Sequence, residues 1–260
     1  MTTPAFGGEV SDFYQRFRRG YPAEVADELA AAFALSQVQD VVLDLGCGTG
    51  QLTRALAPHA RAVLGMDPEP AMLDQARRAT SLPNISWLLG ADTEVSALLP
   101  IIGHGRLAAV TVAQALHWMD HERLFAAARP LLRPGGGIAV VTNGVPLWLQ
   151  DTAWSAAVRD VVAAYLGTPP HRTCGTDEAS QQRYATALAA AGYAVDQRVV
   201  EYATTLTVEE IVGGVFSAMS PEQLPAPDAR PAFTARVRTA LAPHGPLREA
   251  VRVRILLGTR

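Results

Sequence analysis

Segments with the character of strands and helices alternate along the chain between residues 40 and 143. Short, continuously apolar runs such as LAAVTVAQ (107–114) are typical of parallel strands that are buried on both faces. The alternation predicts a doubly wound, mostly parallel α/β sheet in which right-handed crossovers place helices on both faces. We expect strands at 40–45, 61–67, 85–92, 107–114 and 137–143, with a PGGG turn before the last, and helices at 22–35, 51–56, 70–79 and 121–130.

Beyond residue 145 the regular alternation ends and helical segments predominate. We expect helices at 151–166, 178–191, 208–219 and 229–242, and two further strands at 195–206 and 251–258, which would complete a seven-stranded sheet. Helices inserted between the late strands predict a lid over the ligand-binding edge. The whole chain is therefore expected to be a single domain, with a sheet core at about 36–145, 190–206 and 247–260 and a helical lid at about 1–35, 146–180 and 207–246.

The loop after the first expected strand carries glycine at every second position, in the sequence DLGCGTG from Asp44 to Gly50. A dinucleotide fingerprint would need its third glycine at position 51, where this chain has Gln51. Alternating glycines instead allow the backbone to pass close to a ligand, because glycine has no side chain to intrude. The acidic residue that heads the loop would repel a pyrophosphate but would suit a cationic amino group.

Two further strands of the expected sheet also end in acidic residues. Asp67, at the end of the second strand, lies where a carboxylate can accept hydrogen bonds from both hydroxyls of a ribose. Asp92 lies at the end of the third strand, where an oxygen could accept from an adenine amino group. The expected ligand therefore has an adenosine half, no phosphate and a positively charged amino-acid tail. S-adenosylmethionine fits this description.

Four stretches resemble the class I S-adenosylmethionine-dependent methyltransferases: VLDLGCGTGQLT, VLGMDPEPAML, LLGADTE and VAQALHWMD. Within that family the chain is similar to the small-molecule group around the trans-aconitate and ubiquinone-biosynthesis methyltransferases, and the opening FYQRFRRGYP resembles the leader of that group. The resemblance covers roughly residues 10–143. It implies a Rossmann-like methyltransferase fold and S-adenosylmethionine as cofactor.

The resemblance also implies which residues bind the cofactor. The glycine loop would line its methionine part, the second strand its ribose and the third its adenine, while the residues after strand four would flank the reaction centre. The leader would close over the methionine carboxylate. The residues concerned are Tyr14, Arg18, Asp44, Gly46, Cys47, Gly48, Gly50, Asp67, Pro68, Met72, Ala91, Asp92, Gln114 and Ala115.

His117 follows the fourth strand at the expected catalytic edge. It is a candidate general base or acceptor-orienting group, because a base is needed when the acceptor must lose a proton. The alternative is that His117 and Trp118 pack together and brace the loop. Candidate substrate-binding residues are Tyr21, Trp118, Trp148 and His171. The alternative is a packing role for the aromatic residues and a solvated loop for His171. No metal site is expected, because Asp120 is a suitable N-cap that would leave His117 outside the helix that begins near His121.

Composition narrows the function further. The net charge is −3, which argues against a nucleic-acid partner, and all 22 basic residues are arginine, which excludes lysine chemistry. No secretory signal or membrane-spanning apolar run is visible, and the two cysteines, Cys47 and Cys174, are far apart. We therefore expect a cytoplasmic enzyme that acts on a small molecule, plausibly of secondary metabolism, with a homodimer left open.

Two other function classes stay open from the sequence. A non-catalytic sensor or scaffold could keep the cofactor pocket and lack an acceptor site. An NAD-dependent oxidoreductase would share the sheet, but Gln51 stands where its glycine should be. The atom that accepts the methyl group could be oxygen, nitrogen, sulfur or carbon.

Overall fold

The computed structural model describes residues 8–170 and 173–260. The chain forms two compact units, and each is described by itself. We call them the sheet unit (residues 20–144, 174–200 and 252–260) and the helical unit (of the described residues, 8–19, 145–170, 173 and 201–251).

The strands form one seven-stranded sheet with the order β3-β2-β1-β4-β5-β7-β6. The first five strands pair in parallel, and β7 pairs antiparallel with β5. This confirms the predicted mostly parallel seven-stranded fold. The first strand along the chain, β1, lies inside the sheet; β2 and β3 follow toward one edge, and β4 and β5 lie on the other side of β1. The strands are β1 (Val41–Leu45), β2 (Ala62–Asp67), β3 (Ile85–Leu89), β4 (Leu107–Ala113), β5 (Leu132–Asn143), β6 (Ala194–Leu206) and β7 (Leu247–Thr259).

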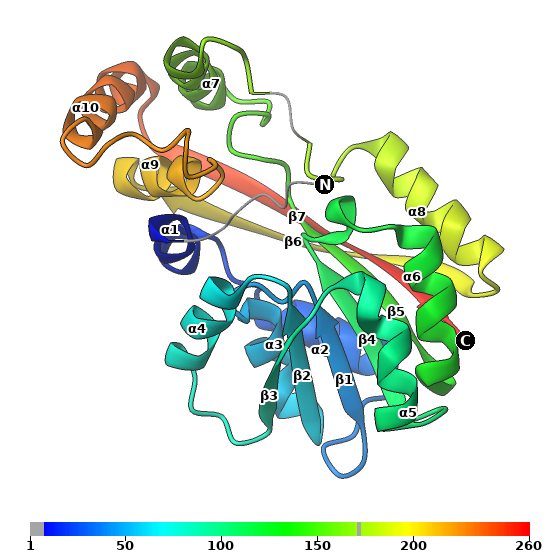
Figure 1. Cartoon of the computed structure of the whole chain (residues 1–260). Coiled ribbons are helices and arrows are strands. Elements are labelled where there is room, and N and C mark those ends of the chain that lie inside the picture. Colours follow the sequence, from blue (N-terminus) through cyan, green and yellow to red (C-terminus); the bar gives the residue numbers. More distant parts are fainter. Residues whose placement is uncertain (1–7, 171–172) are drawn as a thin grey trace. The chain divides into compact units, whose positions relative to one another are not determined.

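Helices cover both faces of the parallel strands in the sheet unit: α5 and α6 lie on one face, and α2 and α3 lie on the other (Figure 1). Apart from Asp44 and Thr111, strands β1 and β4 consist of aliphatic residues because both of their faces are covered, and Leu43 and Val110 are fully buried. The helices of this unit are α2 (Ala23–Ala32), α3 (Gln51–Leu56), α4 (Pro70–Arg78), α5 (Leu99–Ile102), α6 (His121–Ala128) and α8 (Glu178–Ala190).

The sequence-based boundaries were wrong in two places that matter for the loops. The third strand ends at Leu89, and residues Asp92–Leu98 form a 3₁₀ helix, η2, which periodicity did not indicate. The PGGG segment is no turn but part of β5, where the register with β4 shifts between Leu107 and Ala109. A β-bulge accommodates the extra residues, and the glycines allow close packing, since a Cβ on Gly137 would lie 2.2 Å from the Gly258 carbonyl oxygen.

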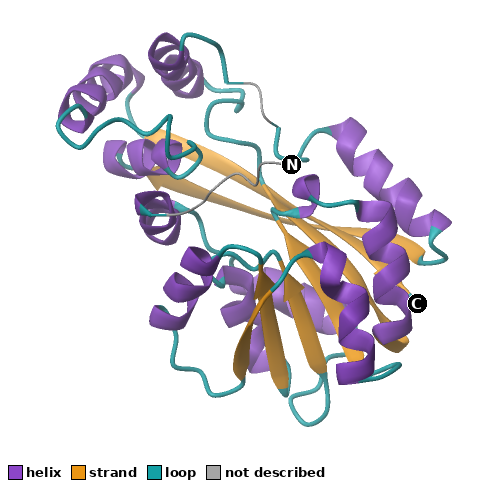
Figure 2. Ribbon diagram, in the orientation of Figure 1, coloured by secondary structure: helices purple, strands orange, loops and turns teal. Residues whose placement is uncertain are grey.

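The helical unit has a hydrophobic core of its own. Its helices are α1 (Glu9–Phe17), α7 (Ala153–Leu166), α9 (Val208–Phe216) and α10 (Arg230–Leu241), which gather beside segments of two strands (Figure 2). Trp154, Phe216 and Phe233 are buried in this core. Helices α1 and α9 approach closely because Gly213 has no side chain: a Cβ there would lie 2.2 Å from the Phe17 ring.

Helix α2, which the sequence analysis assigned to a lid, groups with the sheet unit. The role of the helical unit as a lid stays a prediction. Within the described residues, no helix combines the length and apolar character that a membrane span requires.

Candidate functional site

Asp44 lies one residue before the end of β1 and is 1% exposed. Its carboxylate accepts hydrogen bonds from two hydroxyls: Thr53 Oγ1 at 2.6 Å and Thr111 Oγ1 at 2.8 Å. Burial nevertheless raises the pKa of Asp44 to about 6, because the loss of water disfavours the charged form more than the two hydrogen bonds favour it. A buried acid of this kind is stabilised in its charged form by a nearby cation.

The glycine loop needs its glycines for internal reasons as well as for any ligand. Gly46, Gly48 and Gly50 have φ values of +65°, +54° and +79°, in the left-handed region that favours glycine. A Cβ on Gly46 would lie 2.5 Å from the Cβ of Ala115, so the loop packs directly against the residues that follow β4. The structure thereby brings two predicted site residues, Gly46 and Ala115, into contact.

Trp87 of β3 lies against the same loop and was not singled out from the sequence. A Cβ on Gly50 would lie 2.4 Å from its ring, and one on Gly65 would lie 2.5 Å from it. Cys47 lies beside this contact, because its Sγ would be 3.2 Å from the same Cβ placed on Gly65. Burial raises the pKa of the Cys47 thiol further above its ordinary value, which agrees with its interpretation as a space-filling residue.

Asp67 ends β2 and is 7% exposed. Each of its oxygens accepts one backbone N–H: Oδ2 from Gly48 at 2.8 Å and Oδ1 from Glu69 at 2.9 Å. Because an ionised carboxylate has about four acceptor positions, further acceptor capacity is left for a ligand. Burial raises the pKa of Asp67 from its ordinary value. Asp67 therefore ties the second strand to the glycine loop; of its predicted neighbours, Pro68 is exposed and Met72 is buried in α4.

The residues after β3 form a local hydrogen-bond network. The Ala91 amide donates to Glu94 Oε2 at 2.8 Å, and Asp92 Oδ2 accepts from the Asp120 amide at 3.3 Å. Asp92 thus links the loop after β3 to the loop after β4. A ligand atom that accepts a hydrogen bond from the Ala91 amide would have to displace the Glu94 carboxylate.

Gln114 follows β4 in a left-handed conformation, with φ +54°, and its amide donates to the Val141 carbonyl at 2.9 Å. Its Oε1 is buried and has no hydrogen-bond partner among the described residues. Gln114 lines a small cavity of about 10 Å³, together with His117 and Tyr184. A buried acceptor without a partner is costly, so this oxygen is suited to a ligand or water that donates a hydrogen bond.

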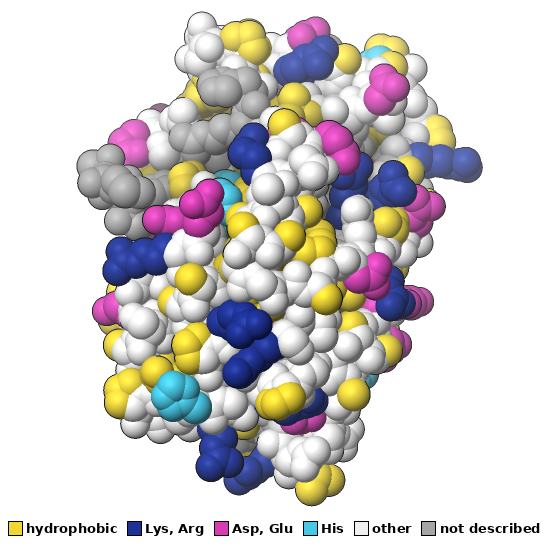
Figure 3. All heavy atoms as spheres, turned by 90° about the vertical axis from the view of Figure 1, so that its right-hand side faces the viewer, with side chains coloured by type: hydrophobic (Ala, Val, Ile, Leu, Met, Phe, Trp, Pro, Cys, Tyr) yellow, Lys and Arg dark blue, Asp and Glu magenta, His cyan; other side chains and the backbone are white. Residues whose placement is uncertain are grey.

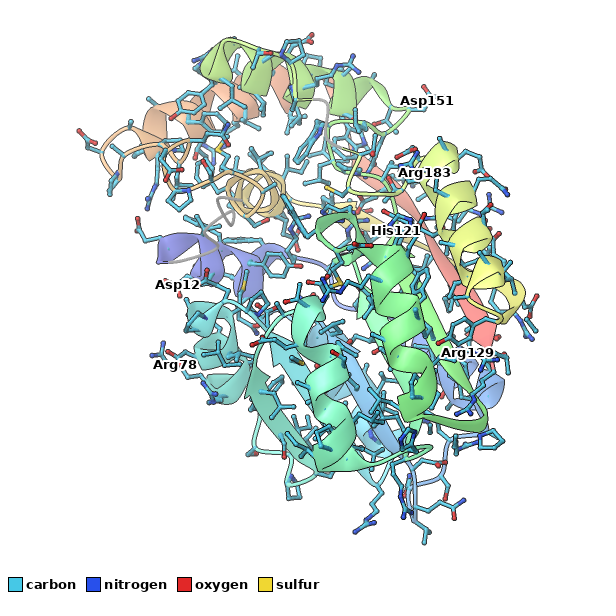
Figure 4. The ribbon with its side chains drawn as sticks, turned by 45° about the vertical axis from the view of Figure 1, so that its right-hand side comes forward. Asp12, Arg78, His121, Arg129, Asp151 and Arg183 are labelled. Atoms are coloured by element: carbon cyan, nitrogen blue, oxygen red, sulfur yellow. The ribbon has the colours of Figure 1, made fainter. Side chains whose placement is uncertain are left out.

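His117 lies in a short 3₁₀ helix, η3 (Leu116–Trp118), and its ring centroid is 4.8 Å from that of the half-exposed Trp118. This ring contact agrees equally with the alternative interpretation, in which His117 and Trp118 pack together and brace the loop after β4. The predicted N-cap is confirmed, because Asp120 Oδ1 accepts from the Arg123 amide at 3.1 Å. His121 therefore begins α6 and lies 5.2 Å from the Tyr184 ring, measured between centroids, and it is labelled at that end of the helix in Figure 4.

The other predicted site residues are placed as follows. Tyr21 is partly buried in the sheet unit. Tyr14, Arg18 and Trp148 belong to the helical unit, where the Arg18 guanidinium lies 5.3 Å from the centroid of the Tyr14 ring. His171 lies outside the described residues.

Sequence reasoning missed Thr53 and Thr111, the two hydroxyl donors to Asp44. A signal for Thr111 was present, because it is the one hydroxyl residue in the otherwise apolar strand LAAVTVA. Its position opposite Asp44 depends on the strand register, which a single sequence does not reveal.

Residues 42–136 match the model of a family described as a methyltransferase domain. An uncharacterised methyltransferase of Mycobacterium bovis is 40% identical over 139 residues, which are 54% of this chain and 52% of that protein. A trans-aconitate 2-methyltransferase of Deinococcus radiodurans is 38% identical over 135 residues, which are 50% of this chain and 47% of that protein. The chain thus spans about half the length of each of these relatives.

Among solved structures, a chain from Anaeromyxobacter dehalogenans assigned as a type II methyltransferase superposes with a TM-score of 0.62. The alignment covers 94% of this chain and 98% of that chain at 21% identity, which shows a shared fold. Together with the sheet order, these matches confirm the predicted Rossmann-like methyltransferase fold, and residues 42–136 are the part of the chain that is similar to the methyltransferase-domain family.

Proposed function

We propose that this chain, with its methyltransferase domain at residues 42–136, transfers the methyl group of S-adenosylmethionine to a small-molecule acceptor. The observation that carries the proposal is the glycine loop held between two buried carboxylates. Asp44 is buried in β1 directly before the loop, and Asp67 accepts from the loop amide of Gly48. One loop thereby offers its backbone, a site for a cation and a site for a sugar.

The residues fit S-adenosylmethionine in two respects. Burial raises the pKa of Asp44 to about 6, and a cationic amino-acid tail or sulfonium nearby would lower that pKa and offset part of the cost of burial. Asp67 retains acceptor capacity for two ribose hydroxyls after its two backbone hydrogen bonds. We therefore assign the methionine end to the loop from Asp44 to Gly50 and the ribose to Asp67.

The remaining assignments follow the order of the strands. Adenine would lie near Pro68, Met72, Ala91 and Asp92, and the methionine carboxylate near Tyr14 and Arg18. Gln114 and Ala115 would flank the reaction centre. The buried Gln114 Oε1 supports this last assignment, because it needs a hydrogen-bond donor.

S-adenosylmethionine supplies an activated methyl group, so the protein's main contribution is to hold the acceptor in line with it. When held between the loop from Asp44 to Gly50 and Asp67, the cofactor would supply its methyl group for in-line displacement by the acceptor, with the sulfur as leaving group. We assign His117 to take the proton of an acceptor that must lose one, or to orient that acceptor. Tyr21, Trp118, Trp148 and His171 are our candidates for substrate contacts.

The distribution of charged side chains on the surface supports a small-molecule acceptor. On the face shown in Figure 3, acidic, basic and uncharged side chains are interspersed, so this face does not present the basic stripe that nucleic-acid binding requires. We propose an acceptor of general or secondary metabolism and a cytoplasmic setting, which the two free cysteines support.

Calorimetry with S-adenosylhomocysteine and with NAD tests the cofactor assignment. We expect S-adenosylhomocysteine to bind and NAD to give no heat; the opposite result would favour an oxidoreductase. Methyl transfer from labelled cofactor to a panel of small hydroxy, amino, thiol and carboxylic compounds then tests catalysis. Binding without transfer to any of them would favour a sensor.

A further inference from the structure

The two edge strands of the sheet differ in length. One edge is β3, with 5 residues, and the other is β6, with 13. A short edge strand offers few main-chain groups, whereas a long one is a template on which a further strand can pair. Proline and glycine, which weaken or interrupt a strand, are absent from β6. Among the described residues, no strand pairs with the outer edge of β6.

Residues 194–200 are the part of β6 that belongs to the sheet unit, and the side chains of 194–199 are all exposed. Successive side chains of a strand point to opposite faces. Asp196 and Arg198 therefore share one face, on which Arg198 Nη1 lies 3.4 Å from Glu28 Oε2 of α2. Val195 and Val199 share the other face and are 39% and 38% exposed. Each face of this segment thus carries a pair of side chains that a neighbouring strand could contact.

A second copy of the same segment can pair with this edge in antiparallel orientation about a twofold axis. Both copies then present the same edge of the same strand. Because the direction of the main-chain N–H and C=O groups alternates along a strand, residues that face each other must be an even number of positions apart. The twofold axis therefore passes through one residue, which faces its own counterpart.

Among the registers centred on residues 196, 197 and 198, only one pairs opposite charges. With Gln197 on the axis, Asp196 faces Arg198 of the second copy twice, and Val195 faces Val199 twice. With Asp196 on the axis two aspartates face each other, and with Arg198 on the axis two arginines do. Like charges directly opposite destabilise a strand pair, whereas opposite charges and β-branched pairs stabilise it. The charges therefore select the register centred on Gln197.

The ion pair within each chain fits the same register. Arg198 Nε lies 3.0 Å from Asp196 Oδ2, and the two side chains are 49% and 61% exposed, so both are accessible to a partner. In the paired strands, acids and arginines would alternate around a square, with each acid between its own arginine and that of the second copy. A network of several surface charges contributes more than an isolated exposed pair.

We propose that residues 194–200 of β6 pair antiparallel with the same residues of a second copy of this chain, which forms a homodimer with a continuous sheet. The pairing supplies roughly six to eight main-chain hydrogen bonds. One strand and its side chains form an interface at the small end for specific complexes, so we expect a reversible dimer with a dissociation constant on the order of 10 µM. The inference rests on the sheet unit alone and does not depend on the proposed methyl transfer.

Two charge reversals test the register, with the dissociation constant of the full chain measured by sedimentation equilibrium. Arg198→Asp places only aspartates around the square, and Asp196→Arg places only arginines. Each variant alone should dimerise at least ~10-fold more weakly than the wild type. An equimolar mixture of the two should recover dimers, because every facing pair is then of opposite charge. Native mass spectrometry identifies the mixed dimer, since the two variants differ in mass.

Asp74→Arg and Arg77→Asp are the matched controls, because they reverse the charges of an exposed ion pair on α4 and change the net charge by the same amounts. Both should dimerise as the wild type does, and the unfolding temperature is measured for every variant to show that it is folded. A wild-type chain that stays monomeric well above the expected dissociation constant would overturn the proposal. A dimer that Arg198→Asp and Asp196→Arg leave unchanged would show that another surface is used, and weakening without recovery in the mixture would refute the register.

Discussion

Thr111 and Asp44 face each other across two parallel strands, and the Thr111 hydroxyl donates to Asp44 Oδ1 at 2.8 Å. Both residues are 1% exposed. A second hydroxyl, that of Thr53, donates to the other oxygen. The carboxylate that heads the glycine loop is therefore held from two sides before any ligand arrives, which fixes the position of the loop relative to β4.

Replacing Thr111 by valine should destabilise the protein while preserving its shape. The change removes one hydrogen bond to a buried carboxylate, so the free energy of unfolding should fall by ~1–3 kcal/mol at neutral pH. Urea denaturation measures the loss. Thr111→Ser keeps the hydroxyl and should retain most of the stability; equal losses in both variants would show that methyl packing, not the hydrogen bond, is responsible.

Asp44 should make stability depend on pH. Burial raises its pKa to about 6 in the folded chain, whereas an unfolded aspartate titrates near ~3.9. Between these values the folded state holds a proton that the unfolded state has lost, so the contribution of Asp44 to the free energy of unfolding falls as pH rises, by ~3 kcal/mol in all. Asp44→Asn carries no titrating group and should lack this fall.

The measurement for Asp44 is urea denaturation of both proteins at pH 4.5 and 7.5. The difference in free energy of unfolding, wild type minus Asp44→Asn, should be larger at pH 4.5. A difference that is the same at both pH values would mean that the folded pKa of Asp44 is close to its ordinary value.

Gly50→Ala should lower the free energy of unfolding by more than backbone strain alone would. With φ +79°, any other residue there is strained, and its Cβ would also lie 2.4 Å from the Trp87 ring. Gly167→Ala is the matched control, because its φ is +74° and nothing lies within 4 Å of the added Cβ. We expect ~1–2 kcal/mol for Gly167→Ala and ~1–3 kcal/mol more for Gly50→Ala, from chemical denaturation. Similar costs would show that Trp87 moves aside freely.

How much of this site the sequence could predict depends on the range of each interaction. The glycine loop, Asp67 and the Asp120 cap are local signals, and Asp120 is confirmed as an N-cap. The partners Thr111 and Trp87 were missed because each meets the loop through strand pairing between distant segments. The PGGG segment was misassigned because a turn and a glycine-rich bulge share the same composition, and only pairing with β4 distinguishes them.

Asp67→Asn should weaken the binding of S-adenosylhomocysteine by ~10-fold or more. The variant keeps the size of the side chain, but it replaces an ionised acceptor, whose hydrogen bonds are the stronger ones, by a neutral amide. Calorimetry gives the affinity. Asp74→Asn, on the exposed side of α4, is the control and should bind normally. If Asp67→Asn also binds normally, the ribose lies elsewhere and our placement of the cofactor is wrong.

His117→Ala should lower turnover and leave S-adenosylhomocysteine affinity close to that of the wild type. A positioned general base contributes typically ~10²–10⁴-fold to a rate, so the loss should be at least ~10²-fold for an acceptor that must release a proton. The ring also contacts Trp118, so the unfolding temperature is measured in parallel to separate a loss of packing from a loss of catalysis. His104→Ala, at an exposed loop position, is the control and should change neither turnover nor affinity. Full turnover in His117→Ala, once an acceptor is known, would assign His117 to bracing the loop after β4.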